Sequence, residues 1–484
     1  MNYRMLLYLL CVILLLEAAI LLIPLFVAVI YGESVLPFVI TIGALVVAAL
    51  PGILQKPKNT KIYAKEGFVT VAASWLLMSA FGALPFVFSG AIPNYVDAFF
   101  ETCSGFTTTG ASILRVIEGL PKGILFWRSF THWIGGMGVL VFMLAILPQG
   151  GNAIYLLRAE VPGPTKGKLV PKLRHTAIIL YAIYIGLTLT EVIALLIARM
   201  PLYDALVTTF GTAGTGGFSV MNDSIAGYHN PAAEWIIAVF MLIFGINFNL
   251  FFLLLIRKWR EVLKSEELRV YLSIAFVATV IVCVQTYNMS SGLEDCIRKA
   301  FFQTTSIIST SGFSTADFDV WPALTKSLLI FLMFVGSCAG STAGGVKVSR
   351  IIIVFKNIVR EIRHMLHPRS VNTVRMDGEP VSEETVKSAV NYVALYIAVL
   401  IFSVLLVSFD KFTFGSGFSF ETNFSGVMAC LNNIGPGFGA VGPTRNYADY
   451  SLFSKIVLSL DMLFGRLEIM PMIILFSPAT WRRK

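Results

Sequence analysis

Four short polar segments of this 484-residue chain share a spacing that could bind a dehydrated cation. Each contains Thr, Ser or Asn and reaches a glycine eleven residues after an apolar residue. Each is too short to cross a membrane, and non-helical backbone at membrane depth is tolerated only where it is buried in protein or lines a water-filled path. Four such turns around one axis would present rings of carbonyl oxygens that replace the hydration shell of a cation. The segments are 99–112, 206–219, 301–314 and 423–439, aligned on Gly110, Gly217, Gly312 and Gly435.

We predict that the cation meets the glycine of each segment and the two residues before it. A short helix ahead of each turn would aim the negative end of its dipole at the same point. One glycine alone is equally well explained by close helix packing, but four at matching positions favour a pore for a monovalent cation. The predicted cation-binding residues are Thr108, Thr109 and Gly110; Thr215, Gly216 and Gly217; Thr310, Ser311 and Gly312; and Asn433, Ile434 and Gly435.

Long apolar runs flank these segments and must position them. The chain is 56% hydrophobic and 13% charged, and an apolar run of about 20 residues can cross a hydrocarbon core of about 30 Å. The first run is too long for a signal-peptide core. We therefore predict an all-α polytopic membrane protein with ten spans, at residues 5–30, 36–54, 67–90, 124–147, 176–199, 233–256, 269–287, 325–355 (interrupted), 388–409 and 452–477.

Each polar segment has one span on either side. This pattern predicts four pseudo-symmetric repeats of span, short pore helix, glycine turn and span around one central pore, preceded by an extra N-terminal pair of spans. The predicted division is 1–60 for the N-terminal pair, then 61–150, 151–262, 263–370 and 371–484 for the four repeats.

The net charge of +9 is mainly a topology signal. Most Lys and Arg residues lie at the two termini and in alternate loops, so we expect a multi-pass protein of the cytoplasmic (inner) membrane, surrounded by lipid, with both termini cytoplasmic. The four polar segments would then enter from the outer side. Binding to nucleic acid is not expected, because the basic residues alternate with spans and form no single stripe.

The stretch 335–349, VGSCAGSTAGGVKVS, interrupts the eighth span. It is not a phosphate-binding loop, because Val346 separates Gly345 from Lys347 and no strand precedes it. A straight helix over 325–357 would be about 50 Å long, more than a bilayer needs. Its glycines each disfavour helix by about 1 kcal/mol relative to alanine. The chain should therefore unwind here, just inside the pore segments, where a polar strand is placed to block ions.

One arginine lies deep in the last predicted span. Arg466 is far from either end, and an ionisable residue at such depth is a functional candidate. Facing the pore, it would repel cations in the inner cavity or hold the unwound stretch through its carbonyls. The alternative is a structural pairing with Glu468 or Asp461. Lys347 is also open to two interpretations, since it could reach the inner interface or take part in gating.

Other polar residues allow weaker expectations. Asp97 and Asp204 precede pore helices, and we favour helix caps over an acidic mouth that concentrates cations. His132 is expected to be a packing hydrogen-bond donor. Asn247 and Asn249 could line the inner cavity or bond between helices, and the sequence does not decide between these.

No catalytic or metal-binding constellation is present in the sequence. The five histidines show no metal or catalytic spacing. The six cysteines lie in or beside apolar runs without paired spacing, so no disulfide framework or metal site is indicated. We expect no enzyme activity, because an intramembrane enzyme would need a metal cluster, paired Asp residues or a Ser–His dyad within its spans.

Several motifs together give the chain its resemblance to a known family. It resembles the superfamily of Trk, Ktr and HKT potassium transporters, and the N-terminal pair of spans is similar to the bacterial Trk branch. The resemblance covers nearly the whole chain. The matching motifs are DAFFETCSGFTTTG (97–110), THWIGGMGVLVF (131–142), GINFNLF (245–251), STSGFST (309–315), AGSTAGGVK (339–347), NNIGPGFG (432–439) and GRLEIMP (465–471).

The resemblance implies a fold, a partner and a gate. It implies a homodimer in which each chain holds its own pore, and a cytosolic ring of nucleotide-binding subunits that controls opening. The basic loops 257–269 and 350–375 are candidate docking surfaces, although inside loops are basic for topology in any case. The loop in the third repeat gates the pore in this family. We therefore predict a gate formed by Gly336, Gly340, Ser341, Thr342, Gly344, Gly345, Lys347 and Arg466.

The predicted function is potassium uptake, with K⁺ as the transported ion and no covalent cofactor. Plant-type members that prefer sodium often carry Ser at the first filter glycine, whereas this chain has Gly110 there and glycine at all four positions. Two alternatives remain: a secondary transporter of another solute, and a sodium-permeable member of the same superfamily. Whether transport is passive or coupled to protons or sodium is not decided by the sequence.

Overall fold

The chain is almost entirely helical. Its computed structural model describes residues 2–55, 57, 59, 63–138, 173–369, 372–414 and 417–481. Within these ranges the extended structure is one short antiparallel hairpin, β1 (Arg375–Met376) with β2 (Glu379–Pro380). The predicted all-α membrane class is confirmed.

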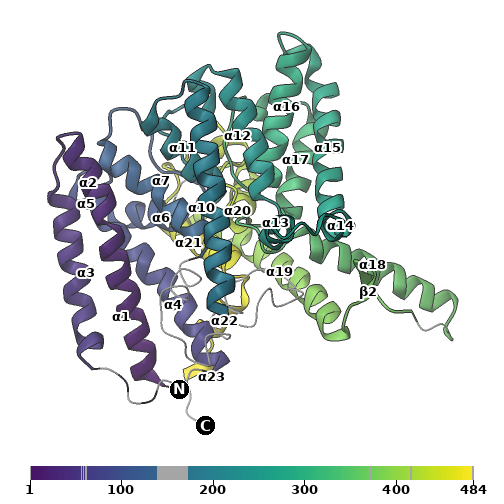
Figure 1. Cartoon of the computed structure of the whole chain (residues 1–484), viewed down its shortest axis with the longest axis horizontal. Coiled ribbons are helices and arrows are strands. Elements are labelled where there is room, and N and C mark those ends of the chain that lie inside the picture. The colour runs from purple at the N-terminus through teal and green to yellow at the C-terminus, as the bar shows by residue number, and fades with distance from the viewer. Residues whose placement is uncertain are drawn as a thin grey trace.

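The N-terminal pair forms one edge of the molecule. A first span of α1 (Tyr3–Ile20) and α2 (Leu22–Ile30) lies beside α3 (Leu36–Leu54) (Figure 1). A methyl group on Gly52 would overlap the side chain of Cys11. The two spans can therefore approach closely only because position 52 carries no side chain.

The remaining helices fall into four sets, each containing one short helix that ends at a predicted cation-binding triplet. The first set is α4 (Ala64–Gly82), α5 (Leu84–Phe88), α6 (Tyr95–Phe106) and α7 (Lys122–Gly136). The second is α10 (Leu173–Ile197), α11 (Leu202–Gly214), α12 (Pro231–Phe244), α13 (Phe248–Leu255) and α14 (Trp259–Lys264). The third is α15 (Glu266–Thr286), α16 (Leu293–Ile308), α17 (Ala323–Val335) and α18 (Val348–Leu366). The fourth is α19 (Glu383–Phe414), α20 (Phe420–Leu431), α21 (Leu452–Arg466), α22 (Met470–Phe476) and α23 (Pro478–Trp481).

Six helices in the described ranges are long and apolar enough to cross a membrane, or seven if one bent pair counts as a single span. The predicted span 124–147 and the basic loop 149–175 extend into residues 139–172, outside the described ranges. Two other predicted spans, 325–355 and 452–477, are each divided between two helices. The total of ten spans and the repeat boundaries stay predictions, and the boundaries at 60, 150 and 370 also lie outside the described ranges.

The prediction of one continuous span at 233–256 is wrong. Helices α12 and α13 meet at 93°. The backbone groups freed at the bend are used by the glycine-rich stretch of the third repeat. The amide of Cys338 donates to the carbonyl of Gly245 (3.1 Å), and the amide of Phe248 donates to the carbonyl of Gly340 (3.0 Å). The bend therefore depends on a segment about ninety residues away in the chain.

The last predicted span, 452–477, is also interrupted. Helix α21 ends at Arg466, and Glu468 and Ile469 have φ angles of +59° and +62°. A β-branched residue in the left-handed region is unusual. A bond from the amide of Ile469 to the carbonyl of Phe464 (2.8 Å) closes this turn before α22 begins. The break places Arg466 at a helix end rather than within a continuous helix.

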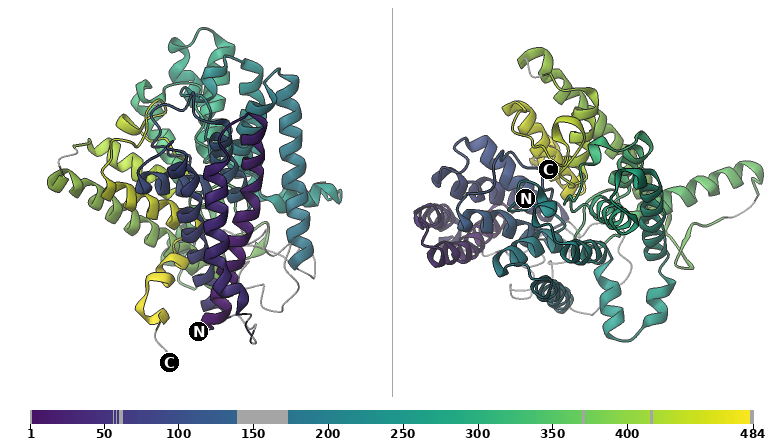
Figure 2. Two further views of the ribbon diagram at one scale, coloured as in Figure 1. Left: turned by 90° about the vertical axis from the view of Figure 1, so that its left-hand side faces the viewer. Right: turned by 90° about the horizontal axis from the view of Figure 1, so that it is seen from above.

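Both chain ends lie at the same end of the helix bundle, as two perpendicular views agree (Figures 1 and 2). Helix α18 and the β1–β2 hairpin project sideways from the bundle. Helix α18 exposes several apolar side chains among charged ones, with Phe355 66% and Met365 78% exposed.

Candidate cation pore and gating loop

Each pore helix ends in the same unusual backbone turn. The first residue and the glycine of every predicted cation-binding triplet have positive φ angles, while the residue between them does not. Such conformations are uncommon for residues other than glycine, so their recurrence at four matching places marks one structural motif used four times. The angles are +55° and +80° at Thr108 and Gly110, +57° and +76° at Thr215 and Gly217, +58° and +78° at Thr310 and Gly312, and +55° and +99° at Asn433 and Gly435.

The four turns meet in a closed ring. A methyl group placed on each triplet glycine would collide with the carbonyl oxygen of the middle residue in the next triplet. The order is cyclic, from the first repeat to the second, third, fourth and back to the first. Both the positive φ and the lack of space require glycine at these positions. The colliding pairs are Gly110 with Gly216, Gly217 with Ser311, Gly312 with Ile434, and Gly435 with Thr109 (2.7 Å).

Side chains behind the ring fix these turns. The amide of Asn433 donates to the hydroxyl of Thr109 (3.0 Å) and to the carbonyl of Met462 (2.9 Å). The hydroxyl of Tyr447 donates to the carbonyl of Gly435 (2.7 Å). The fourth triplet, which has Asn where the others have Thr, is therefore tied directly to the first.

His132 packs against the second triplet as a buried residue. Its Nδ1 lies 2.7 Å from the carbonyl oxygen of Gly105 and therefore carries the hydrogen of this bond. The ring centroid is 4.1 Å from that of Phe218, and a methyl group on Gly216 would overlap the imidazole. The expected packing hydrogen-bond donor is confirmed.

A buried ion pair connects the chain segments that follow the first and second turns. It was not predicted from the sequence. Arg128 Nε donates to Glu101 Oε1 (2.7 Å), and both side chains are almost completely buried. Glu101 also accepts from the amide of Ile113 (2.8 Å), while Arg128 donates to the carbonyl of Ser219 (2.9 Å). The two opposite charges within otherwise buried segments were a signal that could have indicated this pair.

The interpretation of Asp97 and Asp204 as helix caps is wrong. Asn94 caps α6, since its side chain accepts from the amides of the first turn, and Pro201 precedes α11. Asp97 lies in the first turn of α6 and accepts from Lys455 (2.7 Å), which joins α6 to α21. Sequence position alone placed both carboxylates near helix starts, but neither is the capping residue, and Asp97 pairs with a residue far away in the chain.

The chain unwinds between α17 and α18, as predicted, in a glycine-rich loop of residues 336–347. Three of its glycines and Lys347 have positive φ angles. The amide of buried Gly344 donates to the hydroxyl of Thr310 in the third triplet (2.7 Å). A methyl group on Gly344 would also overlap the carbonyl of Asn432, next to the fourth triplet. The loop therefore lies directly against the ring.

Glu267 joins the glycine-rich loop to the start of α18. Its Oε1 accepts from the amide of Ala339 (2.7 Å) and from the amide of Ser349 (3.1 Å), and the side chain is 7% exposed. Ser337 donates to the carbonyl of Ile308 at the end of the third pore helix (2.8 Å). Glu267 was not predicted, because it lies at the start of a span where acidic residues are common.

Arg466 binds carbonyl oxygens of the loop and of the first repeat. It donates to Thr342 (2.6 Å), to Gly136 (2.8 Å) and to Gly135. Glu468, one of the two alternative partners, accepts from Arg350 (2.7 Å). A single guanidinium thus joins the loop to the end of α7.

Lys347 and Asn247 also belong to the loop region. Lys347 is 2% exposed and its ammonium donates to the carbonyl of Ala343, so it does not extend to the interface. Asn247 caps α13 by accepting from the amide of Asn249 (2.9 Å), and it lies against Gly340. The observed role of Asn247, local capping of α13 beside the loop, was not among the two possibilities that the sequence suggested.

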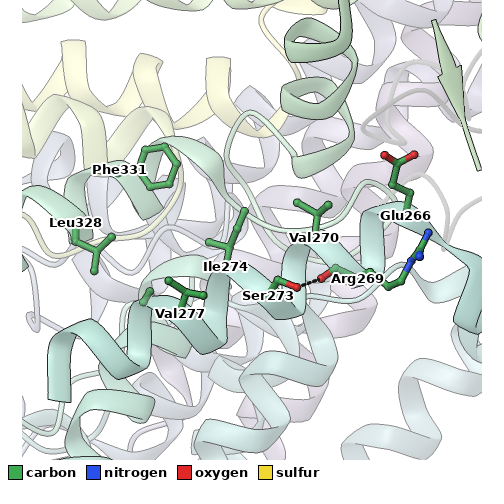
Figure 3. Close-up of a pocket in the computed structure, with 9 residues that line it drawn as sticks. Glu266, Arg269, Val270, Ser273, Ile274, Val277, Leu328 and Phe331 are labelled. Atoms are coloured by element: carbon green, nitrogen blue, oxygen red, sulfur yellow. Dashed lines mark hydrogen bonds between the residues drawn. The ribbon is translucent and has the colours of Figure 1, made fainter. Parts of the chain in front are cut away.

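A groove of about 560 Å³ lies away from this site, between α15 and α17 (Figure 3). Its lining is mostly apolar and includes no residue of the triplets or of the glycine-rich loop. The lining residues are Glu266, Arg269, Val270, Ser273, Ile274, Val277, Ala278, Leu328 and Phe331.

The helical fold and the carbonyl-lined ring above a glycine-rich loop define a polytopic membrane protein built to pass a cation. The family described as "TrkH: Cation transport protein" matches residues 37–483, and the chain belongs to this family. Among the described residues, no group of His, Cys, Asp and Glu could hold a resident metal ion.

Relatives with known names support this assignment over the full length. The chain is 38% identical over 435 residues, 88% of each chain, to the "Trk system potassium uptake protein TrkH" of Escherichia coli strain K12. It is 35% identical over 497 residues, 100% of each chain, to the protein of the same name from Halomonas elongata. The crystal structure of the potassium transporter TrkH from Vibrio parahaemolyticus matches the whole of both chains with a TM-score of 0.88 and 32% identity.

Proposed function

We propose that this protein takes up potassium across the cytoplasmic membrane. Ions entering from outside shed their water against the carbonyl oxygens of the four triplets and then meet the glycine-rich loop. The observation that carries the proposal is the cyclic contact of Gly110, Gly217, Gly312 and Gly435 with the next triplet. The named relatives are potassium uptake proteins, which supports potassium as the ion.

The ring also favours potassium over the two alternatives. A secondary transporter of an organic solute would be expected to use inverted repeats and side-chain ligands at the midplane, whereas the recurring groups here are main-chain carbonyls. A sodium-permeable member would be expected to depart from glycine at the first triplet, which holds Gly110. No enzymatic activity is assigned to the chain.

Gly110→Ser tests the proposal in proteoliposomes. The hydroxymethyl group would collide with the carbonyl of Gly216, so we expect a loss of potassium preference over sodium in flux assays with ⁸⁶Rb⁺ and ²²Na⁺. Gly186→Ser is the matched control, because nothing lies within 4 Å of a methyl group there. Unchanged ion preference in Gly110→Ser, with a folded monodisperse protein, would count against the ring as the selective element.

The gate is proposed to be the glycine-rich loop together with Arg466. In the observed position the loop contacts the third triplet, and Arg466 ties it to α7. Movement of the loop away from the ring would open the inner side of the path. The predicted gating residues Gly336, Gly340, Ser341, Thr342, Gly344, Gly345 and Lys347 all lie in this loop.

We further propose both termini on the cytoplasmic side, a homodimer, and a cytosolic nucleotide-binding regulatory subunit. The common location of the two termini supports the first. The basic segments 257–269 and 350–375 are joined by an ion pair between Glu266 and Lys356 (2.6 Å), so they can offer one docking surface. Flux measured with and without added regulatory subunit, in the wild type and after charge reversal at exposed Arg260, tests this surface.

A further inference from the structure

Two cysteines far from the ring lie in direct contact. Cys283 is in the last turn of α15 and Cys296 is in the first turn of α16, across a short connection. Their sulfur atoms are 3.0 Å apart. A disulfide bond is about 2.05 Å long, so a shift of roughly 1 Å would bring the two sulfurs to bonding distance. The separation of the two cysteines along the chain does not indicate this contact, because the turn between the helices brings them together.

The surroundings orient the two thiols toward each other. Cys296 is completely buried, and its sulfur also lies 3.1 Å from the carbonyl oxygen of Cys283 and 3.9 Å from the hydroxyl of Thr286. Cys283 is half-buried. Cys283, near the end of the predicted span 269–287, is therefore the more exposed of the two thiols, and Cys296 is the buried neighbour that faces it.

The contact is on the side of the membrane where disulfides persist. Helix α15 runs from α14 towards the end of the molecule opposite the two termini (Figure 1). With the proposed orientation, on which this inference rests, that end faces the cell exterior. Disulfides form and persist in oxidising compartments such as the bacterial periplasm and the cell surface.

We propose that Cys283 and Cys296 are a thiol oxidation site that forms an intramolecular disulfide. The oxidant is a protein or small-molecule disulfide outside the membrane. The Cys283 thiolate attacks one sulfur of the oxidant and releases one thiol. The Cys296 thiolate then attacks the Cys283 sulfur of the mixed disulfide and releases the second thiol. Two cysteine thiols are oxidised to one disulfide, and the oxidant disulfide is reduced to two thiols.

The bond would fasten the outer end of the third pore helix to its preceding span. Helix α16 carries Thr310 and Gly312 just beyond its C-terminus, on the ring. Its N-terminal turn is already tied to α12 by an ion pair between Arg298 and Glu234. A covalent bond at Cys296 would also attach α16 to α15. The glycine-rich loop, on the inner side, would not be affected.

Peptide mapping of the full-length protein tests the proposal. Cells are lysed in N-ethylmaleimide, and the purified protein is digested without reductant and analysed by mass spectrometry. We expect a Cys283–Cys296 linked peptide as the major form, converted to two labelled peptides only after reduction. Recovery of both cysteines with the maleimide label before any reduction overturns the proposal.

Thermal unfolding of the same preparation gives a second readout. Reductant is expected to lower the Tm of the wild type and of Cys11→Ser, a control in the distant N-terminal pair, but not that of Cys283→Ser. An equal effect of reductant on all three proteins overturns the proposal, and the mapping decides the question if Cys283→Ser fails to fold. Rubidium uptake is measured in parallel. Free thiols in a protein that takes up rubidium refute only the disulfide. A linked peptide in a protein that does not take up rubidium refutes only the proposed function.

Discussion

The amide of Gly344 in the glycine-rich loop donates a 2.7 Å hydrogen bond to Oγ1 of Thr310 in the third triplet. The two partners belong to the two predicted parts of the transport path, the ring and the gate. Both are buried. The position of the loop and the arrangement of one side chain at the ring are therefore coupled in this conformation.

Thr310→Val is expected to weaken the attachment of the glycine-rich loop to the third triplet. It leaves the amide of Gly344 without its acceptor, at a cost of about 1–3 kcal/mol, which corresponds to a roughly 5- to 150-fold shift away from the observed loop position. Rubidium flux into proteoliposomes without a regulatory subunit should rise within this range. Thr215→Val is the control, because Thr215 has the same place in the second triplet but donates to Gly214. A similar rise in both variants would show that the ring, and not the contact with the loop, is responsible.

Arg466→Ala should also raise the basal rubidium flux, because it releases a different part of the loop. The substitution removes the bonds to the carbonyls of Thr342, Gly135 and Gly136. Hydrogen bonds to a charged group contribute about 1.5–3 kcal/mol each, so basal rubidium flux should increase by at least about tenfold. Arg445→Ala, at an exposed arginine on the proposed outer side, should leave flux unchanged. A folded Arg466→Ala protein with wild-type basal flux would refute a role of Arg466 in closing the path.

The buried pair of Arg128 and Glu101 should matter for stability. Glu101→Gln leaves the buried guanidinium without its countercharge, which costs about 3–5 kcal/mol. We expect a large fall in the Tm measured by size-exclusion chromatography after heating. Arg115→Ala breaks an ion pair with Asp449 in which both side chains are more than 60% exposed, and such pairs contribute about 0–1 kcal/mol. Equal losses in the two variants would contradict the importance of burial.

The sequence predicted the parts of this site that local pattern determines. Glycines at matching distances after apolar residues located all four turns, and a hydrophobic run too long for the membrane located the glycine-rich loop. The 93° bend after α12 escaped prediction, because its freed backbone groups are satisfied by Cys338 and Gly340 from another repeat. Asp97 was misinterpreted for a related reason, since its partner Lys455 is far away in the sequence. Tertiary partners of this kind leave no periodic signal.

Glu267 offers a test that separates hydrogen bonding from charge. One of its carboxylate oxygens accepts from the amide of Ala339 within the glycine-rich loop and from the amide of Ser349 in the first turn of α18. Glu267→Ala removes the acceptor and leaves two buried amides unsatisfied, at about 1–3 kcal/mol each, so basal rubidium flux should rise severalfold or more. Glu267→Gln keeps a side-chain carbonyl at the same place but removes the charge, and it should retain most of the closed behaviour. If the glutamine variant conducts as freely as the alanine variant, the negative charge of Glu267 holds the loop, and the two hydrogen bonds are secondary.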